Sequence, residues 1–94
     1  VDFYVKENLT KNTYFSNKNN RLILNQRFFQ QPYEVIFRAF SDLIKLLGNK
    51  DYPSRGKKID KIIIDLQNNI VKKATLGGCI IEKVNQSVII SKEY

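Results

Sequence analysis

The chain has 94 residues, 43% of them hydrophobic, and 16 basic residues against 9 acidic ones give it a formal net charge of +7. That length allows one compact domain with a modest core, and the apolar fraction argues against disorder. No apolar run approaches the roughly 18 to 20 residues that span a bilayer, so we expect a soluble protein with no membrane partner. One cysteine and no histidine exclude an internal disulfide and a zinc site built from these ligands.

Residues 1 to 31 are predicted to form a helix followed by a short hairpin. Apolar residues recur at helical spacing over residues 1 to 10. Two short β-prone runs, 13 to 15 and 22 to 24, flank an Asn-rich turn, which is the composition of a hairpin. Because the first residue is Val1 and methionine is absent, we expect the chain to be a piece of a longer protein.

Residues 32 to 70 are predicted to form two amphipathic helices joined by a basic elbow. Over residues 33 to 47 apolar side chains recur every three or four positions. Pro32 and Gly48 flank this segment as start and stop signals. Over residues 57 to 70 a second apolar stripe, which ends at Ile70, faces away from three lysines, so one face is expected to join the core and the other to be cationic. The pair Asn68 and Asn69 is a predicted stop signal for this helix.

Aromatic residues lie in and just before the first of these helices. We predict that Phe28 and Phe29 lie in a short helical turn and pack beneath the helix of residues 33 to 47. Phe37 and Phe40 belong to that helix and are predicted to join the same core. The alternative use of such rings is stacking on unpaired nucleobases, which requires that they face solvent.

Residues 71 to 94 are predicted to form a β-hairpin. Two β-prone runs, 79 to 84 and 87 to 91, are separated by the turn residues Asn85 and Gln86. Apolar residues fall on both faces, so we expect one face to pack on the helices and the other on a further partner. We therefore predict an α+β fold in one domain, with two or three packed helices, this C-terminal hairpin and the shorter N-terminal one.

The sequence contains no recognisable catalytic constellation. Cys79 has no histidine to activate it, so a buried apolar role is favoured over a nucleophilic one. Gly77 and Gly78 lack the Lys and the Ser or Thr that complete a Walker loop, so a tight turn or a bulge into the following strand is favoured over a phosphate cradle. We expect no catalytic residue, no metal and no cofactor in this chain.

Positive charge is concentrated in two segments. Residues 1 to 32 carry five basic and two acidic residues, and residues 55 to 73 carry six basic and two acidic ones. The other two segments, 33 to 54 and 74 to 94, are each neutral overall. Two such patches placed side by side would suit a phosphate backbone. The alternative is that codon bias in an AT-rich genome supplies the lysines, which would then form only a solvated face.

The elbow between the two helices is the strongest candidate binding site. Arg55, Lys57, Lys58 and Lys61 cluster at the start of the second helix, whose unpaired amide groups also attract anions. The arginine can bind a phosphate through two hydrogen bonds, and the lysines act as point charges. We therefore predict phosphate contacts here.

Two motifs in the same order resemble the C-terminal part of a known enzyme family. Residues 48 to 58 read GNKDYPSRGKK, residues 74 to 79 read ATLGGC, and residues 32 to 38 upstream read PYEVIFR. Their order and spacing resemble bacterial tRNA(Ile)-lysidine synthetases, especially alphaproteobacterial ones, in which Tyr-Pro-Pro-Arg between helices precedes Thr-Leu-Gly-Gly-Cys. The resemblance covers residues 21 to 93, and Ser54 here takes the place of the family's second proline.

The resemblance implies a function and a division of labour. Members of the family use ATP to adenylate the wobble cytidine of an isoleucine tRNA and then attach lysine to it. Their chemistry resides in an N-terminal domain with a Ser-Gly-Gly-x-Asp-Ser loop, which these 94 residues lack. The resemblance thus implies the tRNA-binding C-terminal region of a cytoplasmic ligase. Its partners would be tRNA and the catalytic domain of its own parent chain, which alone would bind ATP and Mg²⁺.

Two other interpretations remain open beside this one. The chain could be a structural module that docks on a catalytic domain through its hairpin and Phe-rich face, or a stand-alone basic nucleic-acid-binding domain. A single exposed lysine patch would favour nucleic-acid binding, and a contiguous exposed apolar area above a few hundred Å² would favour docking. The predicted nucleic-acid-binding residues are Arg38, Arg55, Lys57, Lys58, Lys61, Lys72 and Lys73.

Overall fold

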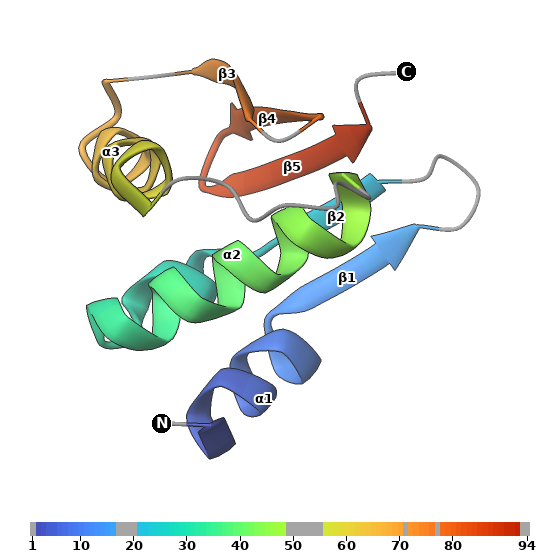
Figure 1. Ribbon diagram of the computed structural model, residues 1–94, viewed down its shortest axis with the longest axis vertical. Coiled ribbons are helices and arrows are strands. Elements are labelled where there is room, and N and C mark those ends of the chain that lie inside the picture. Colours follow the sequence, from blue (N-terminus) through green and yellow to red (C-terminus); the bar gives the residue numbers. More distant parts are fainter. Residues whose placement is uncertain (1, 17–20, 49–55, 71, 77, 93–94) are drawn as a thin grey trace.

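The computed structural model has the predicted α+β fold (Figure 1). It describes residues 2–16, 21–48, 56–70, 72–76 and 78–92. In these parts of the chain the helices are α1 (Asp2–Lys11), α2 (Tyr33–Gly48) and α3 (Gly56–Gln67), with a 3-10 helix η1 (Gln26–Gln30) before α2. The strands are β1 (Thr13–Ser16), β2 (Arg21–Leu24), β3 (Lys73–Leu76), β4 (Cys79–Val84) and β5 (Ser87–Lys92).

The described strands form one antiparallel sheet in the order β1-β2-β5-β4-β3. The two predicted hairpins are confirmed as the β1–β2 and β4–β5 pairs, the second around the turn at Asn85 and Gln86. β2 also pairs with β5, with Ile23 opposite Ile89. The two hairpins, which are far apart in the sequence, therefore build a single sheet.

Strand β3 was not predicted from the sequence. It pairs with the edge of β4, with Leu76 opposite Cys79, so two residues connect the strands. Gly78 lies in this connection with a φ of 82°, a left-handed angle that glycine adopts without steric cost. The tight turn expected at this glycine is present, while residue 77 lies outside the described residues.

Alternation of side chains along the strands places the core on one face of the sheet. Helices α2 and α3 cover this face with the apolar stripes that their 3.6-residue period predicts. On the opposite face Ile23, Ile80 and Ile89 are only partly buried. The buried residues of the central strands are Leu22, Leu24, Cys79, Ile81, Val88 and Ile90.

The aromatic residues around α2 lie in the core, as predicted. Phe28 and Phe40 are fully buried, and Phe29 and Phe37 are partly buried and pack against the core. The ring centroid of Phe29 lies 5.0 Å from that of Phe28 and 6.5 Å from that of Phe40, within the range of favourable ring contacts. Phe29 therefore connects η1 to the core while its ring is still partly accessible.

Helix α1 is tied to the rest of the fold by a buried asparagine. Asn8 donates from Nδ2 to the carbonyl oxygen of Phe28 at 3.3 Å, and its Oδ1 accepts from Nδ2 of Asn12 at 2.8 Å. Both ends of this buried amide are thus hydrogen-bonded, as burial of a polar group requires. These bonds hold α1 against η1 beside α2.

Cys79 is fully buried, and its Sγ lies 3.7 Å from the carbonyl oxygen of Ile44. We expect a thiol reagent such as iodoacetamide to label Cys79 at least about 1,000-fold more slowly in the native protein than in urea, because reaction requires unfolding. Mass spectrometry of timed samples measures this rate. Equal labelling rates in the two conditions would contradict the buried position.

Candidate nucleic-acid interface

The three lysines of α3 lie on its solvent-facing side. Lys57, Lys58 and Lys61 are all exposed, whereas Ile59 and Ile63 on the other side of the helix are buried. Among the described residues none of these lysines forms an ion pair. The predicted cationic face of this helix is therefore present, and its charges are available to an anionic ligand.

The lysines at the start of β3 lie on an element next to α3. Lys72 and Lys73 are both exposed, and β3 runs beside α3 at the top of the molecule (Figure 1). The fold thus places all five predicted phosphate-binding lysines on α3 or at the start of the neighbouring β3. Arg55, the sixth basic residue of this segment, lies outside the described residues.

Arg38 lies apart from these lysines. Its Nη2 pairs with Oδ1 of Asp2 on α1 at 3.0 Å. The preceding residue, Phe37, faces α3, because a methyl group added at Gly56 would lie 3.6 Å from its ring. Since successive helical residues point about 100° apart, α2 separates Arg38 from the α3 lysines. Any contribution of Arg38 to RNA binding would be made from a different surface.

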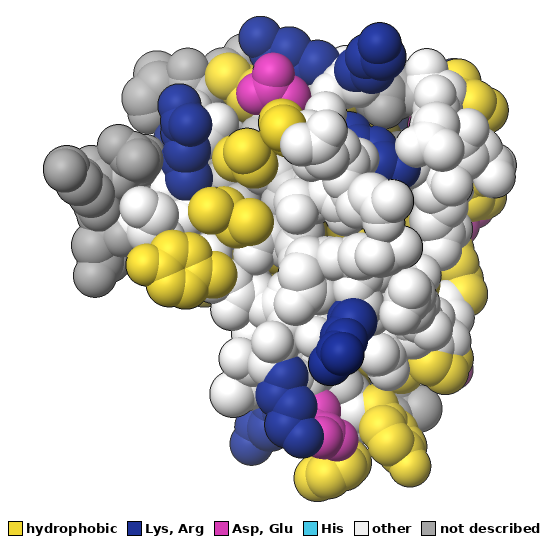
Figure 2. All heavy atoms as spheres, turned by 180° about the vertical axis from the view of Figure 1, so that it is seen from behind, with side chains coloured by type: hydrophobic (Ala, Val, Ile, Leu, Met, Phe, Trp, Pro, Cys, Tyr) yellow, Lys and Arg dark blue, Asp and Glu magenta, His cyan; other side chains and the backbone are white. Residues whose placement is uncertain are grey.

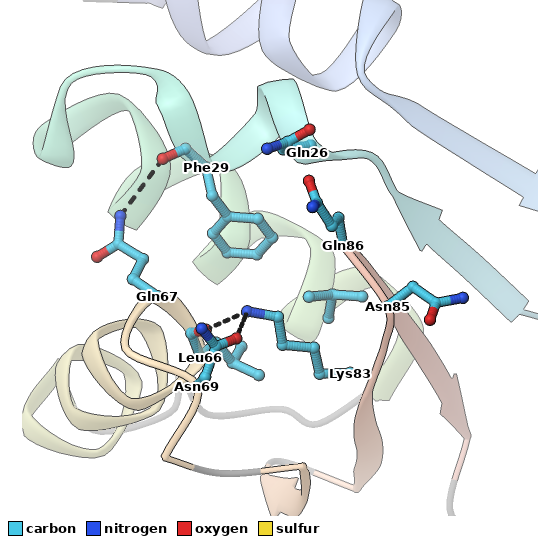
Figure 3. Close-up of a pocket in the computed structure, with 9 residues that line it drawn as sticks. Gln26, Phe29, Leu66, Gln67, Asn69, Lys83, Asn85 and Gln86 are labelled. Atoms are coloured by element: carbon cyan, nitrogen blue, oxygen red, sulfur yellow. Dashed lines mark hydrogen bonds between the residues drawn. The ribbon is translucent and has the colours of Figure 1, made fainter.

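A polar pocket of about 580 Å³ lies at the far end of α3 (Figure 3). Its walls come from η1, the end of α3 and the β4–β5 turn, which are distant in the sequence. Five of its side chains are carboxamides, one is a lysine, and three are apolar. We call this the carboxamide pocket; it is lined by Gln26, Phe29, Leu66, Gln67, Asn69, Lys83, Asn85, Gln86 and Val88.

The end of α3 explains why the pocket forms here. Asn69 adopts a left-handed φ of 58°, and the amide of Ile70 donates to the carbonyl oxygen of Asp65 at 2.9 Å. The amide of Asn69 donates to the carbonyl oxygen of Leu66 at 3.3 Å, which completes a Schellman-type helix end. The helix therefore ends at Gln67, at the predicted Asn-Asn stop, and the carbonyl group of Leu66 faces the pocket. The prediction that Ile70 belongs to the apolar stripe is wrong, because Ile70 lies beyond the helix end and is 68% exposed.

Lys83 fills one side of the pocket. Its Nζ donates to the carbonyl oxygen of Leu66 at 2.6 Å and to Oδ1 of Asn69 at 2.5 Å. Two of the three ammonium donors are therefore used to hold β4 against the end of α3, and one remains for a ligand. Sequence inspection missed this residue, because the carbonyl group that holds it becomes available only in the folded chain.

Some of the carboxamide side chains are hydrogen-bonded within the protein and others are not. Gln67 donates from Nε2 to the carbonyl oxygen of Phe29 at 3.4 Å, and Asn69 is held by Lys83. The side chains of Gln26 and Gln86 make no hydrogen bond to any other described residue, and Figure 3 shows them facing one another at one end of the pocket. The carboxamide groups of these two glutamines, each with a donor and an acceptor, are thus available at this end of the pocket.

Basic residues from the N-terminal segment lie on the other side of η1. Arg27, next to Gln26 in the chain, lines a second polar pocket of about 460 Å³ together with Lys11. Lys11 is paired with Glu7, so its charge is partly compensated. Figure 2 shows Lys and Arg side chains at both ends of one face of the molecule, with largely uncharged surface between them.

An apolar surface lies elsewhere, at the C-terminal end of α2. Leu46 is 76% exposed and Phe15 is 45% exposed. Both border a shallow apolar pocket of about 440 Å³, with Lys92 at its rim. This surface lies on other elements than the α3 lysines, and it shares no lining residue with the carboxamide pocket.

No family model, no curated protein and no solved structure matches this chain. Within the described ranges no group of three His, Cys, Asp or Glu side chains is placed to hold a metal ion. Every helix in the same ranges is too short or too polar to cross a membrane.

Proposed function

We propose that this chain is the tRNA-binding C-terminal region of a tRNA(Ile)-lysidine synthetase. The observation that carries the proposal is the exposed lysine face of α3, which forms no ion pair with any described residue, together with the exposed Lys72 and Lys73 at the start of the neighbouring β3. Three cations within two helical turns match the close spacing of phosphates along a nucleic acid backbone. Unpaired lysines keep their full charge for such a ligand.

The arrangement of elements around the motifs supports the family assignment. Helix α2 ends at Gly48 and α3 begins at Gly56, so the Tyr-Pro-Ser-Arg stretch lies between two helices, as in the family that the sequence resembles. The Thr-Leu-Gly-Gly-Cys motif spans the connection of β3 to β4. Both motifs thus occupy junctions between elements, where loops commonly carry binding residues.

In this role the chain holds the substrate and performs no chemical step. The lysines bind the tRNA backbone and orient the molecule, while the wobble cytidine reaches the parent's catalytic domain in the cytoplasm. That domain supplies the ATP and Mg²⁺ chemistry of adenylation and lysine transfer. Phosphate contacts provide affinity, and contacts to unpaired bases and to shape provide selectivity.

Titration of the chain with an isoleucine tRNA transcript and with an unrelated tRNA, over a series of salt concentrations, tests the proposal. We expect the logarithm of the binding constant to fall linearly with the logarithm of salt concentration, with a slope of about −3.5 if the five lysines contact phosphates. We also expect tighter binding of the isoleucine tRNA. Absence of binding at low salt would refute RNA binding, and equal affinity for both tRNAs would refute the family assignment alone.

A docking function is the second candidate, and the exposed Leu46 and Phe15 favour it. An apolar surface of this kind commonly packs on another domain. It is compatible with tRNA binding, because the two surfaces lie on different elements. If the titration shows no RNA binding, docking on the parent's catalytic domain becomes the better interpretation of the chain.

A further inference from the structure

The carboxamide pocket contains hydrogen-bonding groups that have no partner among the described residues. Gln26 and Gln86 face one another at its opening and make no hydrogen bond to another described residue. Each carboxamide offers a donor and an acceptor in one plane, which is the pattern that pairs with the edge of a nucleobase. Because both side chains can rotate their amide groups, the opening can match more than one base.

An aromatic ring and a cation complete the pocket. The Phe29 ring projects into it between the two glutamines and Lys83, as Figure 3 shows. Partial exposure leaves part of this ring accessible, and its contacts with Phe28 and Phe40 hold it in place. Stacking of a base on such a ring is a common mode of RNA recognition. The remaining ammonium donor of Lys83 is available to a base oxygen or a phosphate.

The pocket lies at the C-terminal end of α3, the helix whose first turns carry the lysines. Lys61 and Gln67 are six residues apart on the same helix, a rise of about 9 Å along its axis. A strand bound through the lysines of the first turns therefore needs to extend only a short distance to reach the pocket. Its volume of about 580 Å³ is within the usual range for small-molecule sites.

We propose that the carboxamide pocket binds one unpaired nucleobase of the RNA, stacked on Phe29 and hydrogen-bonded by Gln26 and Gln86. This inference rests on the proposed RNA-binding function and adds a base-recognition site to it. The lysine face supplies affinity for the backbone, and the pocket selects for an unstacked base. The pocket is a different site from the lysine face, and a different experiment tests it.

The test uses the 94-residue chain labelled with ¹⁵N, because the side-chain amide signals of Gln26 and Gln86 report directly on the pocket. The probes are short single-stranded RNA homopolymers of each base, free nucleoside monophosphates, and inorganic polyphosphate as a backbone mimic without bases. We expect RNA to shift both amide signals and polyphosphate to shift neither. Shifts with monophosphates alone would mean that the pocket takes free nucleotides, which would overturn the RNA assignment.

Variants separate the pocket from the phosphate contacts. The double variant Gln26→Leu, Gln86→Leu is expected to bind the preferred homopolymer about tenfold more weakly with the same salt slope, since it removes base contacts and no charge. Gln30→Leu removes an exposed carboxamide of η1 outside the pocket and is expected to bind like the wild type. All three glutamines are exposed, so folding is expected to be retained.

The outcomes distinguish this inference from the function on which it rests. Salt-dependent RNA binding that the double variant leaves unchanged would overturn the pocket assignment and leave the proposed function intact. Failure of the wild type to bind any RNA would overturn both. Loss of affinity in the Gln30→Leu control equal to that in the double variant would also overturn the pocket assignment, because the effect would not be local.

Discussion

Replacing Lys57, Lys58 and Lys61 together with glutamine is expected to weaken tRNA binding about 100-fold at roughly 0.1 M salt. Each phosphate contact contributes about 0.7 to the salt slope, so three contacts contribute about 2 and the slope should fall by that amount. Because all three lysines are exposed, unfolding free energy should change by less than about 0.5 kcal/mol per site. Fluorescence titrations at several salt concentrations measure both quantities.

A matched variant tests whether the position of the charge matters. Lys6, Lys45 and Lys92 are also exposed but lie on α1, α2 and β5. Their combined replacement by glutamine removes the same charge from other surfaces, where screening limits its influence to about 10 Å at 0.1 M salt. We expect this variant to retain most of the affinity. Equal losses in the two triple variants would show that net charge, and not the α3 face, determines binding.

The Phe40→Ala substitution is expected to lower the free energy of unfolding by about 3 to 5 kcal/mol. The Phe40 side chain is 0% exposed, and its removal leaves a cavity beside Phe29 that the packed helices cannot fill by collapse. A domain of this size has a total stability of roughly 5 to 14 kcal/mol, so the substitution removes a large share of it. Urea denaturation followed by circular dichroism measures the change.

Leu46→Ala provides the control on the same helix. Leu46 is 76% exposed, and its truncation removes little buried area, so we expect a change below about 0.5 kcal/mol. Both substitutions introduce alanine into α2, so the change in helix propensity is similar in the two variants. A loss below about 1 kcal/mol for Phe40→Ala would contradict its position in the core.

Helices α2 and α3 could be predicted because their information is local. The apolar period of α2 is framed by Pro32 and Gly48, and the stripe of α3 is opposed by lysines. The β4–β5 hairpin could be predicted in the same way, since two β-prone runs flank a short Asn-Gln turn. In each case neighbouring residues alone decide which backbone conformation buries the apolar side chains.

Strand β3 shows where local information is insufficient. Its sequence, Lys-Ala-Thr-Leu, has weak β-propensity and little apolar character. It becomes a strand because the edge of β4 offers unpaired backbone groups, with Ala74 opposite Ile81. Such pairing depends on which segment lies at the edge of the sheet, and that is a property of the assembled fold.

The lysine face of α3 could be predicted in the same way as the helix, since the period that buries Ile59 and Ile63 must expose Lys57 and Lys61. The grouping of Arg38 with these lysines could not, because its direction depends on how α1 packs beside α2. Side chains on different elements share a surface only after those elements have been placed.

The sequence alone determined the helices, the two hairpins, the aromatic core and the exposed lysines, because each follows from periodicity within a short segment. Only the tertiary structure decided that β2 pairs with β5, and only this fold brings Gln26, Lys83 and Gln86 together at the end of α3. The physical reason is that sheet pairing and helix packing are long-range contacts. Their geometry is selected by burial of the whole core, which no local pattern of residues encodes.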